Sequence, residues 1–578
     1  MTGPSDAVFN AWSDYAVDAG QRWVLFLDTL RQRGDTQIRM AAEPRAMVLW
    51  FDHEVVMSGR ALPRPINFAL HRILPPANMP ADPAKRPVMV IDPRAGQGAG
   101  IGGFKQESEI GDALAAGHPV YFIGFSAEPE PGQTFLDVIE GEIAFMERIV
   151  EEHPDAPRPA AIGNCQAGYQ VLMAAALRPD LFGPCLIVGS PMSYWQGRRG
   201  EAAMRYLGGL LGGSWPTALT GDLGNGTFDG AWLVMNFDLL GPANYLWDKQ
   251  YEVYAHVDEG AERYLAFERW WGDFVLFNAE EIQYLVDNMF VGDRLARGAL
   301  TARDGTKVDL RALNSPTVIL TSTRDHISPP AQTLGWIPDL YRDVEEIRAA
   351  GRVIVYAVED RTGHLGLFVS ARVADREDEE FVLTMDAIND LGPGLYEMVI
   401  TPAVQDGTPA GIEGGPQWAV AFEPRTVDDV RAFGRNTPDE NAAFAAVDRI
   451  SQINLALYRA FVQPLVRAGV NEASAEALRA LHPLRLSYTL FSGLNPWTAI
   501  PAALAPSIRA HRRPVAADNP FMEAQESLSR TISASIDAWR VMRDQATEDW
   551  FFGLYGSAPM QLWFGEGRTR RRRRHAPA

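Results

Sequence analysis

The chain has 578 residues, a formal net charge of −20 and 47% hydrophobic residues. This length accommodates two or three domains, and the negative charge argues against a nucleic-acid partner. Cys165 and Cys185 are the only cysteines, which excludes a disulfide framework and a cysteine-rich metal site. The amino-terminal residues lack a signal-peptide pattern, and no apolar run reaches the length of a transmembrane segment. We therefore expect a cytoplasmic protein without a membrane span.

The first 80 residues are predicted to form a helical N-terminal region. Residues 5–33 carry apolar side chains at helical spacing, including Trp12 and Trp23. We interpret this stripe mainly as core contact, with a membrane-like or granule surface as the alternative. Residues 46–75 are predicted to form a second helix and a proline-punctuated linker.

From residue 87 onward, short buried strands alternate with helices. Strands are predicted over 88–91, 120–126, 185–189, 317–320 and 353–358, together with a strand that ends at Gly163. Such a succession implies an α/β fold with a mostly parallel sheet and helices on both faces. Residues 81–192 and 311–400 would form this core.

The alternation stops between residues 193 and 310, a stretch rich in Trp and Tyr that is predicted to be helical. Its position suits a cap over an active site, and the alternative is a subdomain with an aromatic core. A charge run over 375–380 and a Gly/Pro-rich stretch over 401–416 place a boundary before a helical C-terminal domain, residues 401–567. In that domain Thr437 has the sequence of a helix start. The Arg-rich tail, residues 568–578, is predicted to be solvated.

The sequence AAIGNCQAGY, residues 160–169, has the pattern of a nucleophile elbow. A strand-like run meets a helix-like run at Cys165, and small residues are needed two positions before and after a nucleophile at such a turn. Gly163 and Ala167 meet that need. We predict that Cys165 is the nucleophile, the alternative being a buried core cysteine, and that Cys185 is core packing within its strand.

Residues 98–103 match the dinucleotide pattern G-x-G-x-x-G, but the match begins several residues after the preceding strand ends. Because pyrophosphate must meet the helix amino terminus at the strand end, we interpret this segment as a loop at the edge of the sheet. An elbow enzyme takes one oxyanion N–H from the residue after the nucleophile, here Gln166, and another from such a loop. We place the second donor at Gly96, within residues 95–98.

Two further side chains follow predicted strands at the same edge. Asp325 comes shortly after the strand that ends at Leu320, and His364 follows the next strand. The chain order nucleophile, acid, base is that of an elbow enzyme, so His364 would accept the thiol proton and Asp325 would orient the imidazole. His326 is a competing base that more plausibly braces the loop. No cofactor and no metal ion are expected.

The segments GNCQAG, TSTRDHISPP and RTGHLGLFV together resemble the corresponding blocks of polyhydroxyalkanoate (PHA) synthases, within the α/β-hydrolase superfamily. The resemblance covers about residues 85–370, and it implies a Cys165, Asp325 and His364 triad in an α/β-hydrolase-type sheet with a helical cap and helical extensions. It also implies an acyl-CoA substrate, a polyester granule surface as a partner and a homo-oligomer.

The choice of a thiol favours acyl transfer. An acyl group moved from CoA to Cys165 remains a thioester and keeps its transfer potential for a second acceptor. The sequence therefore predicts an acyltransferase of the PHA-synthase type, acting on 3-hydroxyacyl-CoA. The alternatives are a Cys-dependent hydrolase (a thioesterase, an esterase or an enzyme like dienelactone hydrolases) and a non-catalytic granule-surface or scaffold protein.

Overall fold

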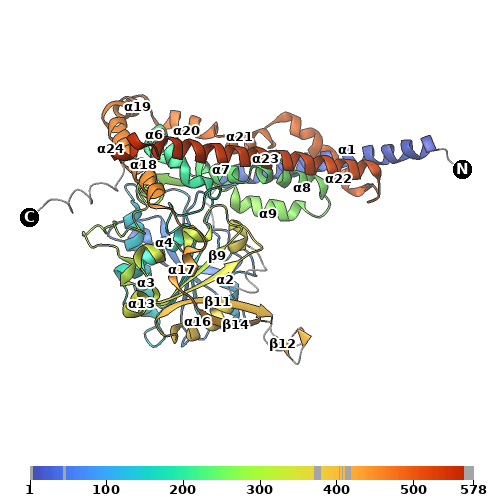
Figure 1. The fold of residues 1–578 in the computed structure, drawn as a ribbon. Helices are drawn as coiled ribbons and strands as arrows, with labels where there is room; N and C mark the ends of the chain where they lie inside the picture. The colour runs from blue at the N-terminus through green and yellow to red at the C-terminus, as the bar shows by residue number, and fades with distance from the viewer. Residues whose placement is uncertain are drawn as a thin grey trace, which may run out of the picture.

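A computed structural model describes residues 4–42, 47–369, 379–402, 404–405, 408–409 and 418–564. Figure 1 shows two layers: an α/β unit and a layer of long helices that lies across one side of it. The helical layer combines both ends of the described chain, because α1 (Pro4–Ala42) runs beside α22 (Ala499–Ala510) and α23 (Pro520–Tyr555).

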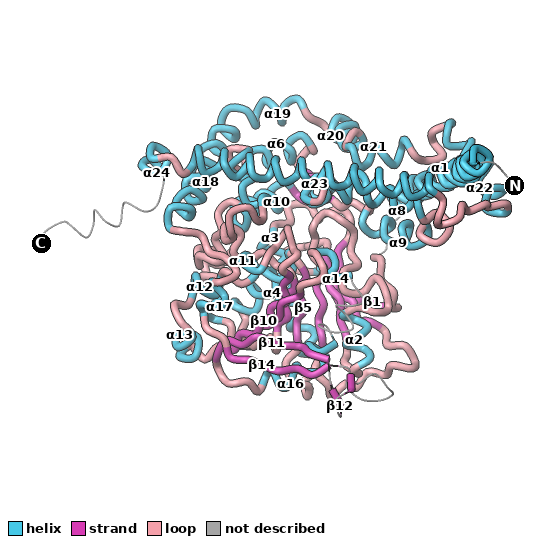
Figure 2. The backbone as a smooth tube through the Cα atoms, turned by 45° about the vertical axis from the view of Figure 1, so that its right-hand side comes forward, coloured by secondary structure: helices cyan, strands magenta, loops and turns pink. Residues whose placement is uncertain are grey.

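The α/β unit contains a ten-stranded sheet whose order is β1-β2-β4-β3-β5-β6-β9-β10-β11-β14. The run from β4 to β11 is parallel, whereas β1, β2 and β14 pair antiparallel at the two ends. This sheet confirms the expected α/β class, and Figure 2 shows it beneath the helical layer. Its strands are β1 (His53–Ser58), β2 (Phe68–Ile73), β3 (Val88–Ile91), β4 (Val120–Phe125), β5 (Ala160–Asn164), β6 (Cys185–Val188), β9 (Thr317–Ser322), β10 (Val353–Glu359), β11 (Gly394–Pro402) and β14 (Trp418–Pro424).

Helices cover both faces of the sheet. Successive strand residues point to opposite faces, so their side chains join two different apolar clusters, one under each layer of helices. Met89 and Ile91 of β3 join one cluster, while Val88 and Val90 join the other. The first cluster includes side chains of α3 (Phe135–Glu152), α4 (Gln166–Leu177), α12 (Trp336–Leu340), α13 (Val344–Ala349) and α17 (Val427–Arg431). The second includes side chains of α2 (Glu109–Ala115), α14 (His364–Val369) and α16 (Glu379–Asn389).

Residues 193–310 form short helices and a two-stranded antiparallel sheet between the main sheet and the helical layer. This small sheet pairs β7 (Thr227–Asp229) with β8 (Leu276–Asn278). The helices are α5 (Leu207–Leu210), α6 (Trp215–Leu223), α7 (Ala231–Leu240), α8 (Lys249–Ala255), α9 (Ala261–Trp271) and α10 (Ala279–Leu285). α11 (Pro330–Thr333) follows β9 later in the chain.

The prediction of a helix within residues 46–75 was wrong. Residues 53–58 and 68–73 are the antiparallel strands β1 and β2, and β2 pairs with β4. Phe68 and Leu70 are buried in the sheet core. Apolar residues in a short segment fit either a helix or a strand, and pairing with β4, which lies about 50 residues on, decided for the strand.

The sheet continues past residue 400, because β11 and β14 belong to it, and a short hairpin of β12 (Val404–Gln405) and β13 (Thr408–Pro409) lies between them. The expected boundary at 400 therefore falls inside the last parallel strand. Most of the predicted charge run, most of the Gly/Pro-rich stretch and the Arg-rich tail lie outside the described residues.

The helix start predicted at Thr437 is present. Its hydroxyl accepts from the Glu440 N–H, and the Glu440 carboxylate accepts from the Thr437 N–H. The helices that follow are α18 (Pro438–Leu457), α19 (Gln463–Gly469), α20 (Glu472–Ala480), α21 (Pro483–Leu490), α22, α23 and α24 (Ala558–Phe564).

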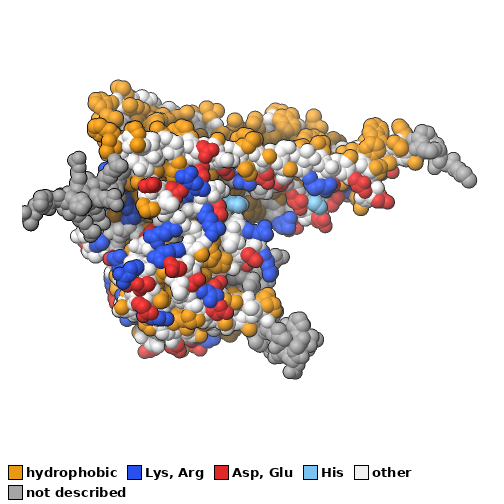
Figure 3. All heavy atoms as spheres, viewed as in Figure 1, with side chains coloured by type: hydrophobic (Ala, Val, Ile, Leu, Met, Phe, Trp, Pro, Cys, Tyr) orange, Lys and Arg blue, Asp and Glu red, His pale blue; other side chains and the backbone are white. Residues whose placement is uncertain are grey.

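The outer side of the helical layer is rich in exposed apolar side chains. Figure 3 shows them along its outer edge. Trp12 and Trp23 of α1 are about half exposed, so the predicted core contact of this stripe holds only for residues such as Phe26 and Leu30. In the described part of the chain, no helix is long and apolar enough to cross a membrane.

Candidate active site

Cys165 occupies a sharp turn between β5 and α4. Its backbone angles, φ 48° and ψ −119°, are disfavoured for a residue with a side chain. Two contacts hold this conformation: the Cys165 N–H donates to Val188 O at 2.8 Å, and the Ser190 hydroxyl donates to Cys165 O at 2.5 Å. The structure thus has the strand–turn–helix geometry of a nucleophile elbow at the predicted residue.

Small residues around Cys165 are required by close packing. A Cβ on Gly163 would lie 2.8 Å from Gly168 Cα, and a Cβ on Gly168 would overlap the Ser190 hydroxyl. Ala167 is fully buried. Strand β5 and helix α4 therefore approach each other closely enough only with the residues that the sequence places there.

The structure brings the three predicted catalytic side chains together. His364 Nε2 lies 3.3 Å from Cys165 Sγ, and His364 Nδ1 lies 2.7 Å from Asp325 Oδ2. Asp325 follows β9 and His364 begins α14 after β10, so adjacent parallel strands deliver both to one edge of the sheet. In this geometry Nε2 can accept the thiol proton while Asp325 holds the proton on Nδ1.

Electrostatics favour a charged imidazole beside the thiol. Burial disfavours the imidazolium, but the Asp325 carboxylate and the Cys165 thiolate outweigh it and raise the pKa of His364 to about 10. Burial likewise opposes ionisation of Asp325, yet the facing His364 and hydrogen bonds from Ser328 hold the pKa of this carboxyl below its usual range. By contrast, burial raises the pKa of Cys185 to about 12.

Ser328 belongs to this network and was not predicted. Its hydroxyl lies 2.8 Å from Asp325 Oδ2, 3.1 Å from His364 Nδ1 and 2.6 Å from the carbonyl of Gly189. Its N–H also donates to Asp325 Oδ1. A serine three residues after an aspartate is a common turn signal that could have revealed it.

The competing base, His326, is exposed. It lines a surface pocket with Thr323 and Pro329. The carboxylate of the neighbouring Asp325 contacts His364 Nδ1 instead. The structure therefore does not bring His326 to Cys165 in place of His364.

The predicted oxyanion donors lie on two different elements, the start of α4 and the loop after β3. Gln166 is the first residue of α4, where backbone N–H groups are left free by the helix, and its side chain is fixed by a hydrogen bond from Tyr169. In the loop, Ala95 and Gln97 line the cavity at Cys165 and flank Gly96. The Ala95 N–H already donates to a carbonyl, that of Pro93.

Gly96 is held tightly in that loop. Its φ is +110°, and a Cβ there would overlap the carbonyl of Gly230. Its own carbonyl accepts from the Val275 N–H at 3.0 Å, which ties the loop to the residue before β8. Asp92 fixes the far end of the loop, because its Oδ2 accepts from the N–H groups of Gly100 and Ile101, each at 2.6 Å.

A buried carboxyl hydrogen-bonds to the residue that precedes Cys165. Glu109 Oε2 accepts from the Asn164 amide at 2.8 Å, and Asn164 directly precedes Cys165. Burial, with smaller contributions from Asp112 and Asp92, raises the pKa of Glu109 to about 8. This carboxyl is thus mostly neutral at neutral pH, and it positions the residue before the nucleophile without adding a full charge.

A small, largely apolar cavity of about 20 Å³ adjoins Cys165 and His364. That space holds about one water molecule and no acyl group. The insertion contributes two of its walls, Phe237 from α7 and Trp271 from α9. Among the described residues, no group of three or more His, Cys, Asp or Glu side chains could hold a metal ion.

One family model matches nearly the whole chain. The model of the family described as "Protein of unknown function (DUF3141)" matches residues 18–578. The chain belongs to this family. A protein of Rhizobium meliloti described as "Uncharacterized protein in ackA 5'region" is 52% identical over 555 residues, which cover 95% of this chain and 75% of the relative.

More distant relatives are described as poly(3-hydroxyalkanoate) polymerase subunit PhaC. The proteins of Haloferax mediterranei and Synechocystis are each 24% identical to this chain, over 277 and 274 residues. These matches cover 46% of this DUF3141 chain, and 51% and 68% of the two relatives. The chain spans about half the length of the Haloferax relative. The chain is thus a member of the DUF3141 family with distant sequence similarity to PhaC subunits over about half of its length.

Solved structures with similar folds include hydrolases. The acylaminoacyl peptidase of Pyrococcus horikoshii has a TM-score of 0.31 and 14% identity, with 62% of this chain and 44% of that chain covered. A thermophilic esterase of Thermogutta terrifontis has a TM-score of 0.33 and 11% identity, with 58% and 99% covered.

Proposed function

We propose that this protein is an acyltransferase of the PHA-synthase type that carries a 3-hydroxyacyl group as a thioester on Cys165. The observation that carries the proposal is the contact series from Cys165 Sγ through His364 to Asp325 at a strained elbow. The distant similarity to PhaC subunits supports the choice of acyl-CoA as the donor.

The proposed reaction has two transfers. His364 Nε2 takes the thiol proton, the Cys165 thiolate adds to the acyl-CoA carbonyl, and the C–S bond to CoA then breaks as His364 returns the proton to the CoA sulfur. In the second transfer, His364 takes the proton of an acceptor hydroxyl, whose oxygen attacks the thioester carbonyl and forms an ester; the C–S bond to Cys165 breaks as His364 returns the proton to the Cys165 sulfur. Gln166 and Gly96 N–H groups would stabilise the negative oxygen in both steps.

The small volume and apolar walls of the cavity at Cys165 favour transfer over hydrolysis. A thioester on Cys165 lasts longer where few water molecules reach it, and apolar walls that include Phe237 and Trp271 limit the space to about one water molecule. A hydrolase needs no such exclusion, because water is its acceptor. The small apolar volume therefore supports an acyltransferase over a Cys-dependent hydrolase.

The test uses 3-hydroxybutyryl-CoA with the full-length protein. We expect release of CoA, an acyl adduct on the peptide that contains Cys165, and an ester-linked product by mass spectrometry. Cys165→Ala should abolish all three, and Cys185→Ala serves as the matched control that should retain them. Free 3-hydroxybutyrate as the sole product would establish the hydrolase, and CoA release by Cys165→Ala at the wild-type rate would refute a Cys165 thioester.

A further inference from the structure

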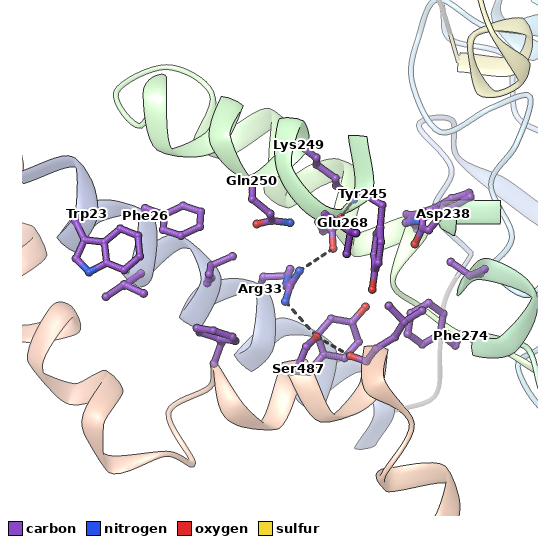
Figure 4. Close-up of a pocket in the computed structure, with 18 of the residues that line it drawn as sticks. Trp23, Phe26, Arg33, Asp238, Tyr245, Lys249, Gln250, Glu268, Phe274 and Ser487 are labelled. Atoms are coloured by element: carbon purple, nitrogen blue, oxygen red, sulfur yellow. Dashed lines mark hydrogen bonds and ion pairs between the residues drawn. The ribbon is translucent and has the colours of Figure 1, made fainter. Parts of the chain in front are cut away.

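A second and much larger cavity lies directly behind the wall of the cavity at Cys165. Its volume is about 640 Å³, within the usual range for small-molecule sites. It is enclosed by α1, α7, α9 and α21 together with residues 245–250, so the two ends of the chain and the insertion all contribute. We call it the helical-layer chamber (Figure 4).

The walls of the chamber suit an apolar ligand. Most of its lining side chains are aromatic or aliphatic, among them Phe26, Leu30 and Phe274. Both cations of the wall pair with the same carboxylate: Arg33 Nη1 lies 3.5 Å from Glu268 Oε2, and Lys249 forms an ion pair with Glu268 Oε1.

Arg33 is further engaged by neighbouring hydroxyls. It donates to Ser487 at 3.3 Å and to Tyr264 at 3.1 Å, and Figure 4 shows it pointing between Glu268 and Ser487. Because Arg33 is already engaged by Glu268, Tyr264 and Ser487 and most of the wall is apolar, the chamber suits the phosphates of CoA poorly. An acyl chain, which needs burial but no counter-charge, is the better occupant.

A single layer of side chains separates the chamber from Cys165. Trp271 lines both cavities. On α7, Phe237 lines the cavity at Cys165, whereas Val234 and Asp238 line the chamber. An acyl chain in the chamber therefore lies one indole ring away from the nucleophile.

Trp271 lies at the end of a helix, where fewer helix residues surround its side chain. It is the last residue of α9, and Gly272 follows as the helix cap. The Trp271 indole donates a hydrogen bond to Asp238, whose pKa burial raises to about 7, and it packs against the rings of Phe267 and Trp270 at 5.9 and 5.5 Å between centroids. The barrier is thus one side chain at a helix end, held by a hydrogen bond and by two neighbouring rings.

The other end of the chamber opens at the surface of the helical layer. Trp23, Leu246 and Trp497 line the chamber and are 55%, 54% and 42% exposed. Figure 4 shows Trp23 and Phe26 at one end, and Phe274 with Asp238 at the other. A chain can therefore enter from the exposed apolar face and extend towards Trp271.

We propose that the helical-layer chamber binds the acyl chain of the substrate and that Trp271 is the gate that opens it to Cys165. This proposal rests on the proposed function, since it names where the chain of the transferred acyl group lies. The volume at Cys165 cannot hold an acyl group, and the adjoining chamber supplies that volume.

The test measures alkylation of Cys165, which needs no acyl-transfer chemistry. Iodoacetamide and N-octyl iodoacetamide are compared, and the ratio of their rates at Cys165 reports binding of the octyl chain. Leu27→Trp fills the chamber from α1 and should lower this ratio about tenfold, the effect of excluding about two methylenes. Gln250→Trp is a second filling variant, and Val17→Trp, exposed on α1 outside the chamber, is the matched control.

The gate is tested with Trp271→Ala. Removing the indole should raise the rate for the octyl reagent about tenfold if the open state is about one tenth populated, and it should raise the rate for iodoacetamide less. Trp232→Ala, on α7 and lining neither cavity, should leave both rates unchanged. Equal gains for the two reagents in Trp271→Ala would overturn the gate.

These outcomes are separable from those of the proposed function. If the octyl ratio is the same in wild type, both filling variants and Val17→Trp while the protein still releases CoA, the chamber is refuted and the acyltransferase stands. If the ratio responds as expected but no acyl-CoA is consumed, the chamber binds an apolar chain and the proposed donor is wrong. In that second case, octanoate and octanoyl-CoA compared as competitors of octyl labelling distinguish a free fatty acid from a thioester ligand.

Discussion

Replacing Asp325 by Asn tests the proposed charge distribution at Cys165 with little change in shape. Asp325 Oδ1 accepts from the N–H groups of Ile327 and Ser328 at 2.7 and 2.9 Å, and an Asn oxygen can accept both. The Asn amide would then face His364 Nδ1 in place of Oδ2. A donor there favours the tautomer with the ring proton on Nε2, so the imidazole takes the thiol proton less readily.

The structure sets the scale of the effect. A pKa of about 10 for His364, against an ordinary value of 6.5, corresponds to about 5 kcal/mol of net stabilisation of the imidazolium. Loss of the hydrogen bond between the Asp325 carboxylate and the imidazolium costs about 2 kcal/mol, the usual scale for a charged hydrogen bond, so the imidazolium–thiolate pair becomes about 30-fold less populated. Because the raised pKa keeps His364 charged up to about pH 10, the loss should be evident throughout the neutral range.

The assay is the rate of iodoacetamide labelling of Cys165 at neutral pH, followed on its tryptic peptide. We expect a fall of about 30-fold in Asp325→Asn. Asp360→Asn, an exposed carboxyl in the loop before His364, is the matched control and should label like wild type. A rate for Asp325→Asn within about threefold of wild type, in a folded protein, would refute the argument that Asp325 controls the charge of His364.

Other predictions follow from the elbow and its support. In wild type, iodoacetamide should modify Cys165 well before Cys185, because burial raises the pKa of the Cys185 thiol to about 12; comparable rates by peptide mass spectrometry would contradict this. Gly168→Ala should lower the free energy of unfolding by about 1–3 kcal/mol in urea, whereas Gly553→Ala, with open space at its Cβ, should not lower it. The Glu109 carboxyl binds its proton more tightly in the folded protein than in the unfolded chain. Its contribution to the free energy of unfolding is therefore fully present below about pH 4.5 and is lost as the pH rises through about 8. Glu109→Gln should flatten this part of the urea midpoint profile, and an unchanged slope would show that the carboxyl is ionised in the fold.

The part of the site that the sequence predicted rests on short-range constraints. Cys165 needs small neighbours at fixed offsets, and the close approach of Gly163 to Gly168 is the physical form of that need. Asp325 and His364 could be placed because parallel strands end at the same edge of a sheet, so a position just after each strand is a position in space. Their contacts agree with this expectation, and their catalytic roles stay predictions.

Ser328 and the two N-terminal strands were missed for a different reason. The turn signal three residues after Asp325 indicates a contact with Asp325, but only the fold brings the same hydroxyl to His364. Residues 53–58 and 68–73 have apolar content that fits either a helix or a strand, and their conformation depends on pairing with β4. Such choices are made by partners that are distant in sequence.

The amino-acid sequence by itself determined the α/β fold, the elbow and the candidate triad, because side-chain size, strand burial and position after a strand are properties of short segments. The helical-layer chamber and its partition from Cys165 were decided only by the tertiary structure. α1 and α21 come from opposite ends of the chain, and their side chains enclose a volume only when both pack against the insertion. Trp271, which the sequence shows merely as one of many aromatic residues in the insertion, acquires its place between two cavities from that packing.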